Sequence, residues 1–154
     1  MKWTRLPMAA AILLCASATA DAQTVAGRWI IDFNRSIRNE NGVVTEGDPA
    51  RARMTLEQHG DSVTGTWALI SPVEDPMPAP RGLRGTIANG EVHLVSDPFS
   101  ARVRDESGER EIKVRATYVF RLDGDVLRGT QLTRPEGVED GPPARPFLAK
   151  REGP

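Results

Sequence analysis

Two stretches of the chain carry nearly the same pattern, and this repeat limits the possible fold more than any other feature. They are Tyr118–Thr130, YVFRLDGDVLRGT, and Met54–Thr66, MTLEQHGDSVTGT. In both, apolar residues alternate with other residues, a Gly-Asp pair follows, and a branched apolar residue leads to Gly-Thr. Leu83–Thr86 repeats the last part. Alternation is typical of a strand with one buried face, and Gly-Asp fits a tight turn, so the repeated unit is predicted to be strand, turn, strand.

The same alternation continues along the chain and predicts eight strands. In its clearest run one face is apolar throughout and the other is almost wholly polar, and no window of useful length has helical periodicity. The predicted strands are Val25–Phe33, Arg51–Gln58, Ser62–Ile70, Gly82–Ala88, Glu91–Ser96, Glu111–Leu122, Val126–Thr133 and Arg145–Arg151.

Short and long connections alternate between these strands. The short ones are turns at residues 59–61, 89–90 and 123–125, and the long ones are residues 34–50, 71–81, 97–110 and 134–144. In an up-and-down meander, this order places the tight turns at one end and the long loops at the other. Eight such strands are enough to close without exposed edges. The predicted fold is all-β, an eight-stranded antiparallel meander barrel.

The fifth strand is the least well defined. Residues Ala101–Arg104 also alternate, which leaves a second arrangement open. In that arrangement a hairpin runs from these residues through Ser107-Gly108 into the sixth strand, with a kink at Asp97-Pro98.

The N-terminus has the pattern of an export signal. A basic start precedes the apolar run Met8–Ala16, which is too short to span a bilayer, and Ala20–Ala22 fits a small-x-small cleavage site. We therefore expect residues 1–22 to be a signal peptide and residues 23–154 to form a single barrel domain. The expected location is the periplasm or the medium.

Cysteine content and charge exclude several classes. The only cysteine, Cys15, lies in the leader, so the mature chain has no thiol for disulfides or catalysis. A lipoprotein with lipidated Cys15 is the alternative, although bulky Leu14 precedes it where a small residue is preferred. A formal net charge of −1 gives no electrostatic reason to expect nucleic acid or an anionic membrane surface as partner. We expect no nucleic-acid partner and no membrane span.

The first and last strands resemble those of one barrel family. Val25–Trp29, VAGRW, is similar to the Gly-x-Trp opening of lipocalin and calycin barrels, here Gly27-x-Trp29. Phe147–Arg151 resembles their closing strand, whose basic residue packs over that tryptophan. Bacterial exported lipocalin-like domains also carry Gly-Asp-x-apolar-x-Gly-Thr hairpins. The resemblance implies a meander barrel of the lipocalin-like or avidin-like kind. Because lipocalins mostly hold small apolar ligands, it also implies a ligand of that kind.

Structural roles are expected for five residues. Strand parity brings Trp29 and Arg151 to the closed end of a barrel, where the long arginine stem can cover the indole. Gly65, Gly85 and Gly129 lie inside strands near tight turns. Such glycines either leave room for a bulky neighbour such as Trp29 or allow strand coiling at a barrel corner.

No group of residues in the sequence has the spacing of a catalytic or metal site. His59 lies in a turn and His93 is expected to point outward, and two isolated histidines without cysteine give no zinc spacing. The carboxylates at 105–109 and 136–140 lack calcium-loop spacing, and the serines lack a Gly-x-Ser-x-Gly context. We therefore expect no enzymatic activity, no catalytic residue, no metal and no cofactor.

The barrel interior is the remaining candidate site, and it is either filled or leaves room for one small ligand. Tyr118 would be a polar group in an apolar pocket. The candidate ligand-binding residues in the open half are Phe33, Met54, Trp67, Leu69, Leu83, Val114 and Tyr118.

Three functions are compatible with these features. The first is an exported lipocalin-like protein that binds a small apolar or amphipathic ligand at the loop end. The second is an interaction or inhibitor module that presents its loops, among them the proline-rich residues 71–81, to another protein. The third, an enzyme on the same barrel, has no acid–base pair to support it. An open cavity above about 300 Å³ would favour the ligand.

Overall fold

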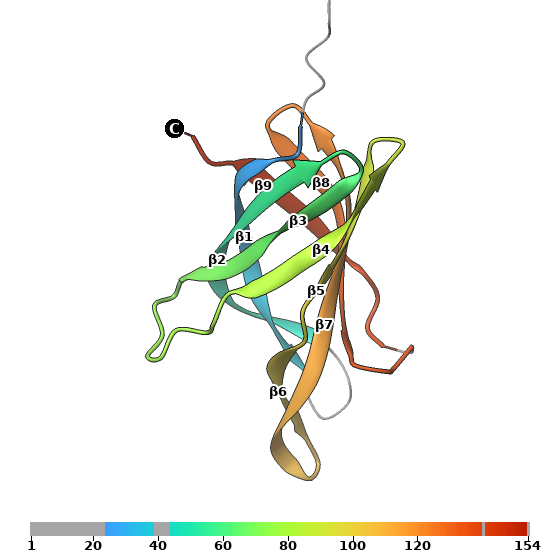
Figure 1. Cartoon of the computed structure of the whole chain (residues 1–154). Helices are drawn as coiled ribbons and strands as arrows, with labels where there is room; N and C mark the ends of the chain where they lie inside the picture. Colours follow the sequence, from blue (N-terminus) through green and yellow to red (C-terminus); the bar gives the residue numbers. More distant parts are fainter. Residues whose placement is uncertain (1–23, 39–43, 140, 154) are drawn as a thin grey trace, which may run out of the picture.

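The computed structural model describes residues 24–38, 44–139 and 141–153, and its nine strands form one closed sheet (Figure 1). Each strand is antiparallel to its neighbours; β1 also pairs with β9, and β5 pairs with both β4 and β7. The structure is therefore an eight-stranded antiparallel barrel, as predicted, in which β5 and β6 successively occupy one strand position. The strands are β1 (Gly27–Arg38), β2 (Val44–His59), β3 (Ser62–Ser71), β4 (Arg81–Ala88), β5 (Glu91–Ser96), β6 (Phe99–Asp105), β7 (Gly108–Asp123), β8 (Val126–Pro135) and β9 (Arg145–Arg151).

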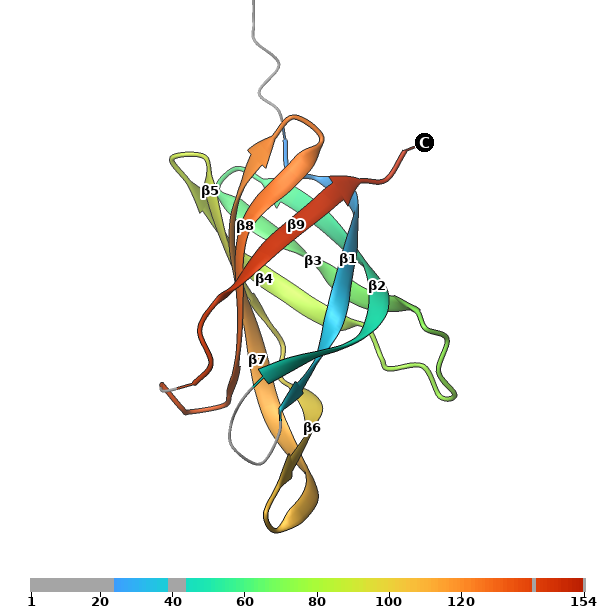
Figure 2. The same ribbon diagram turned by 180° about the vertical axis from the view of Figure 1, so that it is seen from behind.

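The tight turns gather at one end of the barrel and the longer connections at the other (Figures 1 and 2). The closed end carries the β2–β3, β4–β5 and β7–β8 turns, together with the start of β1 and the end of β9. The open end carries the β3–β4 and β8–β9 connections and the projecting β6–β7 hairpin. The predicted leader, residues 1–22, lies outside the described residues.

Two of the four long loops were predicted wrongly. Within residues 34–50, β1 continues to Arg38 and β2 begins at Val44. Within residues 97–110, β6 and the start of β7 form a hairpin. In both places the strands run on past the barrel as two-stranded ribbons, so the sheet does not end where the core ends. The connections predicted at 71–81 and 134–144 are largely irregular, although β8 extends to Pro135.

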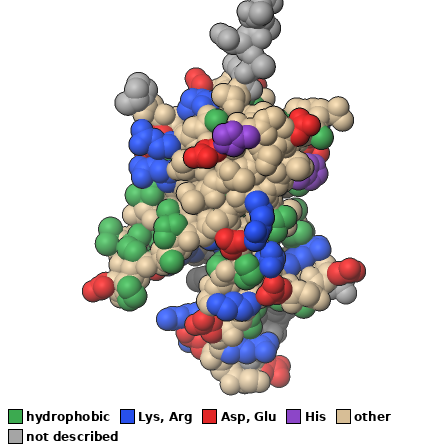
Figure 3. All heavy atoms as spheres, viewed as in Figure 1, with side chains coloured by type: hydrophobic (Ala, Val, Ile, Leu, Met, Phe, Trp, Pro, Cys, Tyr) green, Lys and Arg blue, Asp and Glu red, His purple; other side chains and the backbone are tan. Residues whose placement is uncertain are grey.

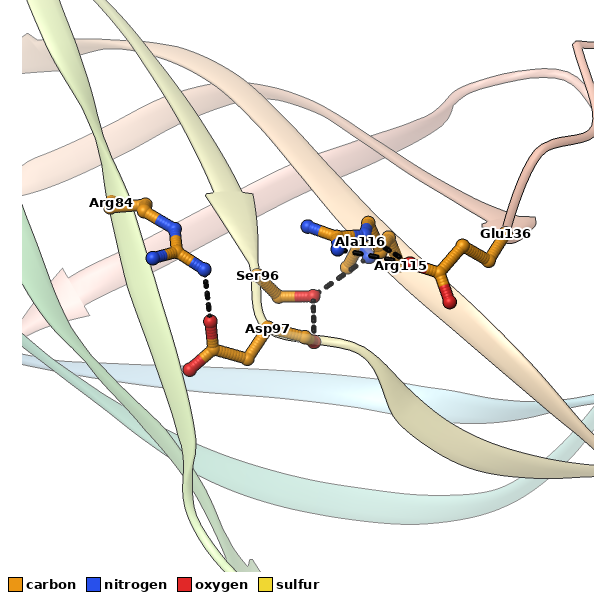
Figure 4. Close-up of polar contacts among 6 residues, drawn as sticks. All are labelled: Arg84, Ser96, Asp97, Arg115, Ala116 and Glu136. Atoms are coloured by element: carbon orange, nitrogen blue, oxygen red, sulfur yellow. Dashed lines mark hydrogen bonds and ion pairs between the residues drawn. The ribbon is translucent and has the colours of Figure 1, made fainter.

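A buried serine marks the break between β5 and β6 (Figure 4). The Ser96 hydroxyl donates to the Asp97 carbonyl at 2.9 Å and accepts from the Ala116 N–H of β7 at 2.9 Å. The Ser96 hydroxyl therefore accepts the hydrogen bond from β7 that a backbone carbonyl would accept if the strand were not interrupted. Arg84 of β4 holds the Asp97 carboxylate at 2.6 Å, and Pro98 follows, a residue with no N–H for the ladder. The kinked hairpin left open by the sequence is the arrangement found.

The closed half of the barrel is filled by side chains. Tyr118 and Phe120 pack their rings against Phe147, with ring centroids 5.3 and 5.5 Å apart. The largest fully buried apolar side chains are Trp29, Tyr118, Phe120, Met54, Leu56, Leu94 and Leu127.

Arg151 covers Trp29 at the closed end, which is the arrangement predicted from strand parity. The two residues are register partners in β1 and β9, and the guanidinium carbon lies 4.1 Å from the centroid of the fully buried indole ring. The indole N–H donates to the Val25 carbonyl at 2.9 Å. The guanidinium donates to the carbonyls of Ala26 and Thr24 at 2.9 and 3.1 Å. Both polar groups are therefore satisfied by the main chain.

The three inward glycines allow neighbouring strands to approach closely. A Cβ atom would lie 2.0 Å from the Thr55 carbonyl oxygen at Gly65, and 1.8 Å from that of His93 at Gly85. At Gly129 it would lie 1.9 Å from the Val119 carbonyl oxygen. These contacts are with backbone rather than with Trp29, which favours strand coiling over room for a bulky side chain.

Gly129→Ala is therefore expected to lower the free energy of unfolding by about 2 kcal/mol, because two paired strands must separate to admit the methyl group. Gly153→Ala is the control, since a Cβ atom there meets nothing within 4 Å. Chemical denaturation measures both. Equal stability of the two variants would show that the strands at Gly129 separate without cost.

Candidate ligand-binding site

The open half of the barrel interior is less enclosed than the closed half. On β3, Val63 near the closed end is fully buried, whereas Trp67 and Leu69 on the same face are half-buried. On β4, Leu83 is buried and Arg81 is half-buried. The inward faces of these strands therefore pass from a packed core to a partly open space. We call the open half of the barrel interior the cup.

A cavity of about 430 Å³ lies on one side of the open end. Its walls come from the β6–β7 hairpin, the end of β8, the β8–β9 connection and the first residue of β9, with Glu46 of β2. Most of the lining side chains are apolar. The lining residues are Glu46, Ala101, Arg102, Val103, Ile112, Val114, Gln131, Thr133, Pro135, Pro142, Pro143 and Arg145.

An ion pair closes the rim of this cavity between β2 and β9. Arg145 lies 3.5 Å from the Glu46 carboxylate, which also accepts a hydrogen bond of 2.9 Å from the Asn34 side chain. The opposite charges of Arg145 and Glu46 largely cancel, so this part of the lining does not select a charged ligand strongly.

Planar side chains form a continuous series of contacts across the cup. The rings of Phe33 and Trp67 lie 6.0 Å apart with their planes inclined by 56°, and the Arg81 guanidinium carbon lies 3.7 Å from the centroids of both Trp67 and Phe99. Phe99 is the register partner of Val114, which lines the cavity. The series therefore runs from β1 to the cavity wall and places one guanidinium between two aromatic rings.

The Tyr118 hydroxyl is buried below this level and has no hydrogen-bond partner among the described residues. Burial raises the pKa of Tyr118 to about 12, an effect partly offset by the positive charge of Arg81. Burial likewise lowers the pKa of Arg81. At neutral pH Arg81 is thus a cation in the cup, and the Tyr118 hydroxyl buried below it is neutral.

The predicted ligand-binding residues fall into three groups. Val114 lines the cavity. Phe33, Trp67 and Leu69 are half-buried. The other three, Met54, Leu83 and Tyr118, are packed in the core.

The sequence pattern does not single out most of the cavity wall. Ala101 and Val103 belong to a segment that only alternates, and Ile112 is one residue of a long apolar strand face. Because these residues line a ribbon that extends beyond the core, their position depends on where the neighbouring strands end. The pattern places Arg81 at the end of a loop, although it lies two residues before inward Leu83 and so shares its face.

The two histidines lie on the surface and belong to local pairs. The His93 ring contacts the Glu91 carboxylate at 2.8 Å, and His59 lies 3.8 Å from that of Glu57. Among residues 24–38, 44–139 and 141–153, no group of three His, Cys, Asp or Glu side chains could hold a metal ion. The same part of the chain contains no helix long and apolar enough to cross a membrane.

No protein-family model, curated protein or solved structure matches this chain.

Proposed function

We propose that this protein binds one small, mainly apolar molecule in the cup, in the manner of an exported lipocalin-like carrier. The observation that carries the proposal is the cavity of about 430 Å³ at the open end. Ligand sites in proteins have volumes of about 300–1,000 Å³ and mostly apolar walls with a few polar groups. Most of the lining here is alanine, valine, isoleucine and proline, and the half-buried Trp67 and Phe33 lie across the cup.

Filling the cavity tests this proposal. Ala101→Trp places an indole in the cavity, whereas Ser100→Trp places the same indole on the exposed face of the same strand. The probe is N-phenyl-1-naphthylamine, a neutral dye that fluoresces in apolar surroundings. Its affinity is expected to fall about tenfold or more in Ala101→Trp and to stay unchanged in Ser100→Trp, since lost burial of one ring costs more than 1.4 kcal/mol.

Absence of dye binding to the unmodified protein, or equal binding by both variants, would contradict the proposal. Native mass spectrometry of the exported protein provides a second measurement. A small-molecule adduct that is lost in Ala101→Trp would agree with the fluorescence result.

The β3–β4 connection supports a second function, docking of another protein. Its Val73 and Met77 side chains are 85% and 39% exposed, and apolar side chains gather on this loop in Figure 3. Glu74 pairs with Arg35 of β1, and the Glu74 N–H contacts the Met77 sulfur at 3.0 Å. The loop is thus held against the barrel with its apolar side chains outward. A protein adduct lost in Val73→Ser, with dye binding intact, would favour this function.

A further inference from the structure

Arg81 contrasts with several arginines on the outside of the barrel, which have acidic partners. Arg51, Arg53 and Arg84 each lie within 2.7 Å of a carboxylate oxygen. Within the described residues, Arg81 has neither an ion pair nor a hydrogen bond, and its contacts are with the rings of Trp67 and Phe99. A guanidinium that has lost much of its water normally gains hydrogen-bond acceptors in exchange.

A second arginine, Arg151, shows which hydrogen-bond acceptors a guanidinium on an aromatic ring ordinarily has. Arg151 also lies on an aromatic ring, but its N–H groups donate to the carbonyls of Ala26 and Thr24 and lie 3.3 Å from the Asp125 carboxylate. At the closed end the protein therefore supplies the acceptors. At the open end the described residues supply the rings but no acceptor for Arg81.

The stacking leaves the hydrogen-bonding edge of Arg81 available. Trp67 and Phe99 cover the guanidinium, and its N–H bonds lie in the guanidinium plane. Carboxylate-like groups match this edge with two parallel hydrogen bonds. The Tyr118 hydroxyl, buried beneath the cup, is a second donor that has no partner among the described residues. Two donors without an acceptor are complementary to an oxyanion.

We infer that the ligand of the cup is an organic anion, whose carboxylate or sulfonate binds the Arg81 guanidinium and the Tyr118 hydroxyl while its apolar body extends into the cavity. This inference rests on the proposed function, because it names the chemical class of ligand for the same cup. A neutral apolar molecule would leave both donors without an acceptor, at a cost in affinity. The Glu46–Arg145 pair at the rim adds little net charge, and Arg102 of the lining lies 3.7 Å from the Glu109 carboxylate, so Arg81 supplies the charge preference.

Two dyes with the same ring skeleton test the inference. 1-Anilinonaphthalene-8-sulfonate carries one sulfonate, and N-phenyl-1-naphthylamine is its neutral counterpart. The unmodified protein is expected to bind the sulfonate at least about tenfold more tightly, the ratio that one charge-assisted hydrogen bond supplies. Equal affinity for the two dyes would overturn the inference and leave the proposed function standing. Binding of neither dye would overturn both.

Variants locate the preference within the cup. Arg81→Met keeps an unbranched side chain between the rings but removes the charge, and it is expected to lower sulfonate affinity about tenfold without lowering affinity for the neutral dye. Arg128→Met removes one positive charge from the exposed face of β8 near the closed end and is the control for net charge. A preference that survives in Arg81→Met, or that falls equally in Arg128→Met, would overturn the inference.

Tyr118→Phe keeps the test decisive if Arg81→Met does not fold, which circular dichroism shows. This variant removes only the hydroxyl, and it is expected to weaken sulfonate binding about threefold or more without lowering affinity for the neutral dye. Unchanged affinity for both dyes would remove Tyr118 from the site. If Arg81→Met does not fold, unchanged affinity of Tyr118→Phe for both dyes would overturn the inference.

Discussion

Trp29→Ala is expected to lower the free energy of unfolding by about 3–5 kcal/mol, the usual cost of removing a buried aromatic side chain. The indole is fully buried, and its N–H bond to the Val25 carbonyl is lost as well. The cavity would open where β1 and β9 close the barrel. Denaturation by urea, followed by circular dichroism, measures the loss. A loss below about 1 kcal/mol would mean that the barrel closes equally well without the indole.

Arg151 variants separate the covering side chain from the indole itself. Arg151→Ala is expected to cost less, about 1 kcal/mol, because the guanidinium is partly solvated and gains mainly stacking and stem packing. Arg151→Lys should not fully restore the loss, since an ammonium lacks the planar face and the fork of donors. Dye binding at the other end should be unchanged in Arg151→Ala. Full restoration by lysine would show that only the charge matters.

The second large effect is expected at alkaline pH and comes from Tyr118. Below about pH 10 the hydroxyl is protonated in both the folded and the unfolded chain and gives no pH dependence. Above that pH only the unfolded chain loses the proton readily, because burial raises the folded pKa to about 12. Stability therefore falls as pH rises from about 10 to about 12, by roughly 3 kcal/mol at 1.4 kcal/mol per pH unit.

Tyr118→Phe isolates this effect from the titration of lysines and arginines. The difference in unfolding free energy between the unmodified protein and the variant should change by roughly 3 kcal/mol across this pH range. At neutral pH the variant should be as stable or about 1 kcal/mol more stable, because the lost hydroxyl has no partner. The chain has one tyrosine, so the phenolate absorption band reports Tyr118 directly. A phenolate forming near pH 10 in the folded protein would contradict the expected burial.

Alternation and turn chemistry were sufficient to predict the barrel. Strands β3 and β5, for example, lie within one residue of their predicted limits. The two loops that were predicted wrongly both lie at the edge of the core. The ribbons formed by β1 with β2 and by β6 with β7 continue past the last packed layer, where burial no longer requires the alternation to be strict.

The candidate site was less predictable, because a cavity is made by the ends of several strands. Val114 could be placed from its strand alone. Ala101 and Ile112 face the cavity because β6 leaves β5 at a break, and the sequence shows that break only as an Asp-Pro pair. Arg81 could have been found by extending the inward face back from Leu83, but its contact with Phe99 depends on two segments far apart in sequence.

The ribbon of β6 and the start of β7 is expected to affect the release of a ligand and the thermal stability of the fold differently. Within the described residues, β6 pairs with β7 and no other strand, and a two-stranded ribbon without a third strand is only marginally stable by itself. Such a unit opens at a small fraction of the free energy needed to unfold the whole chain. The ribbon nevertheless supplies a wall of the cavity. We therefore expect local opening of this ribbon to set the residence time of any molecule that the cavity binds, whereas the closed barrel sets the melting temperature, so that sequence changes can alter one without the other.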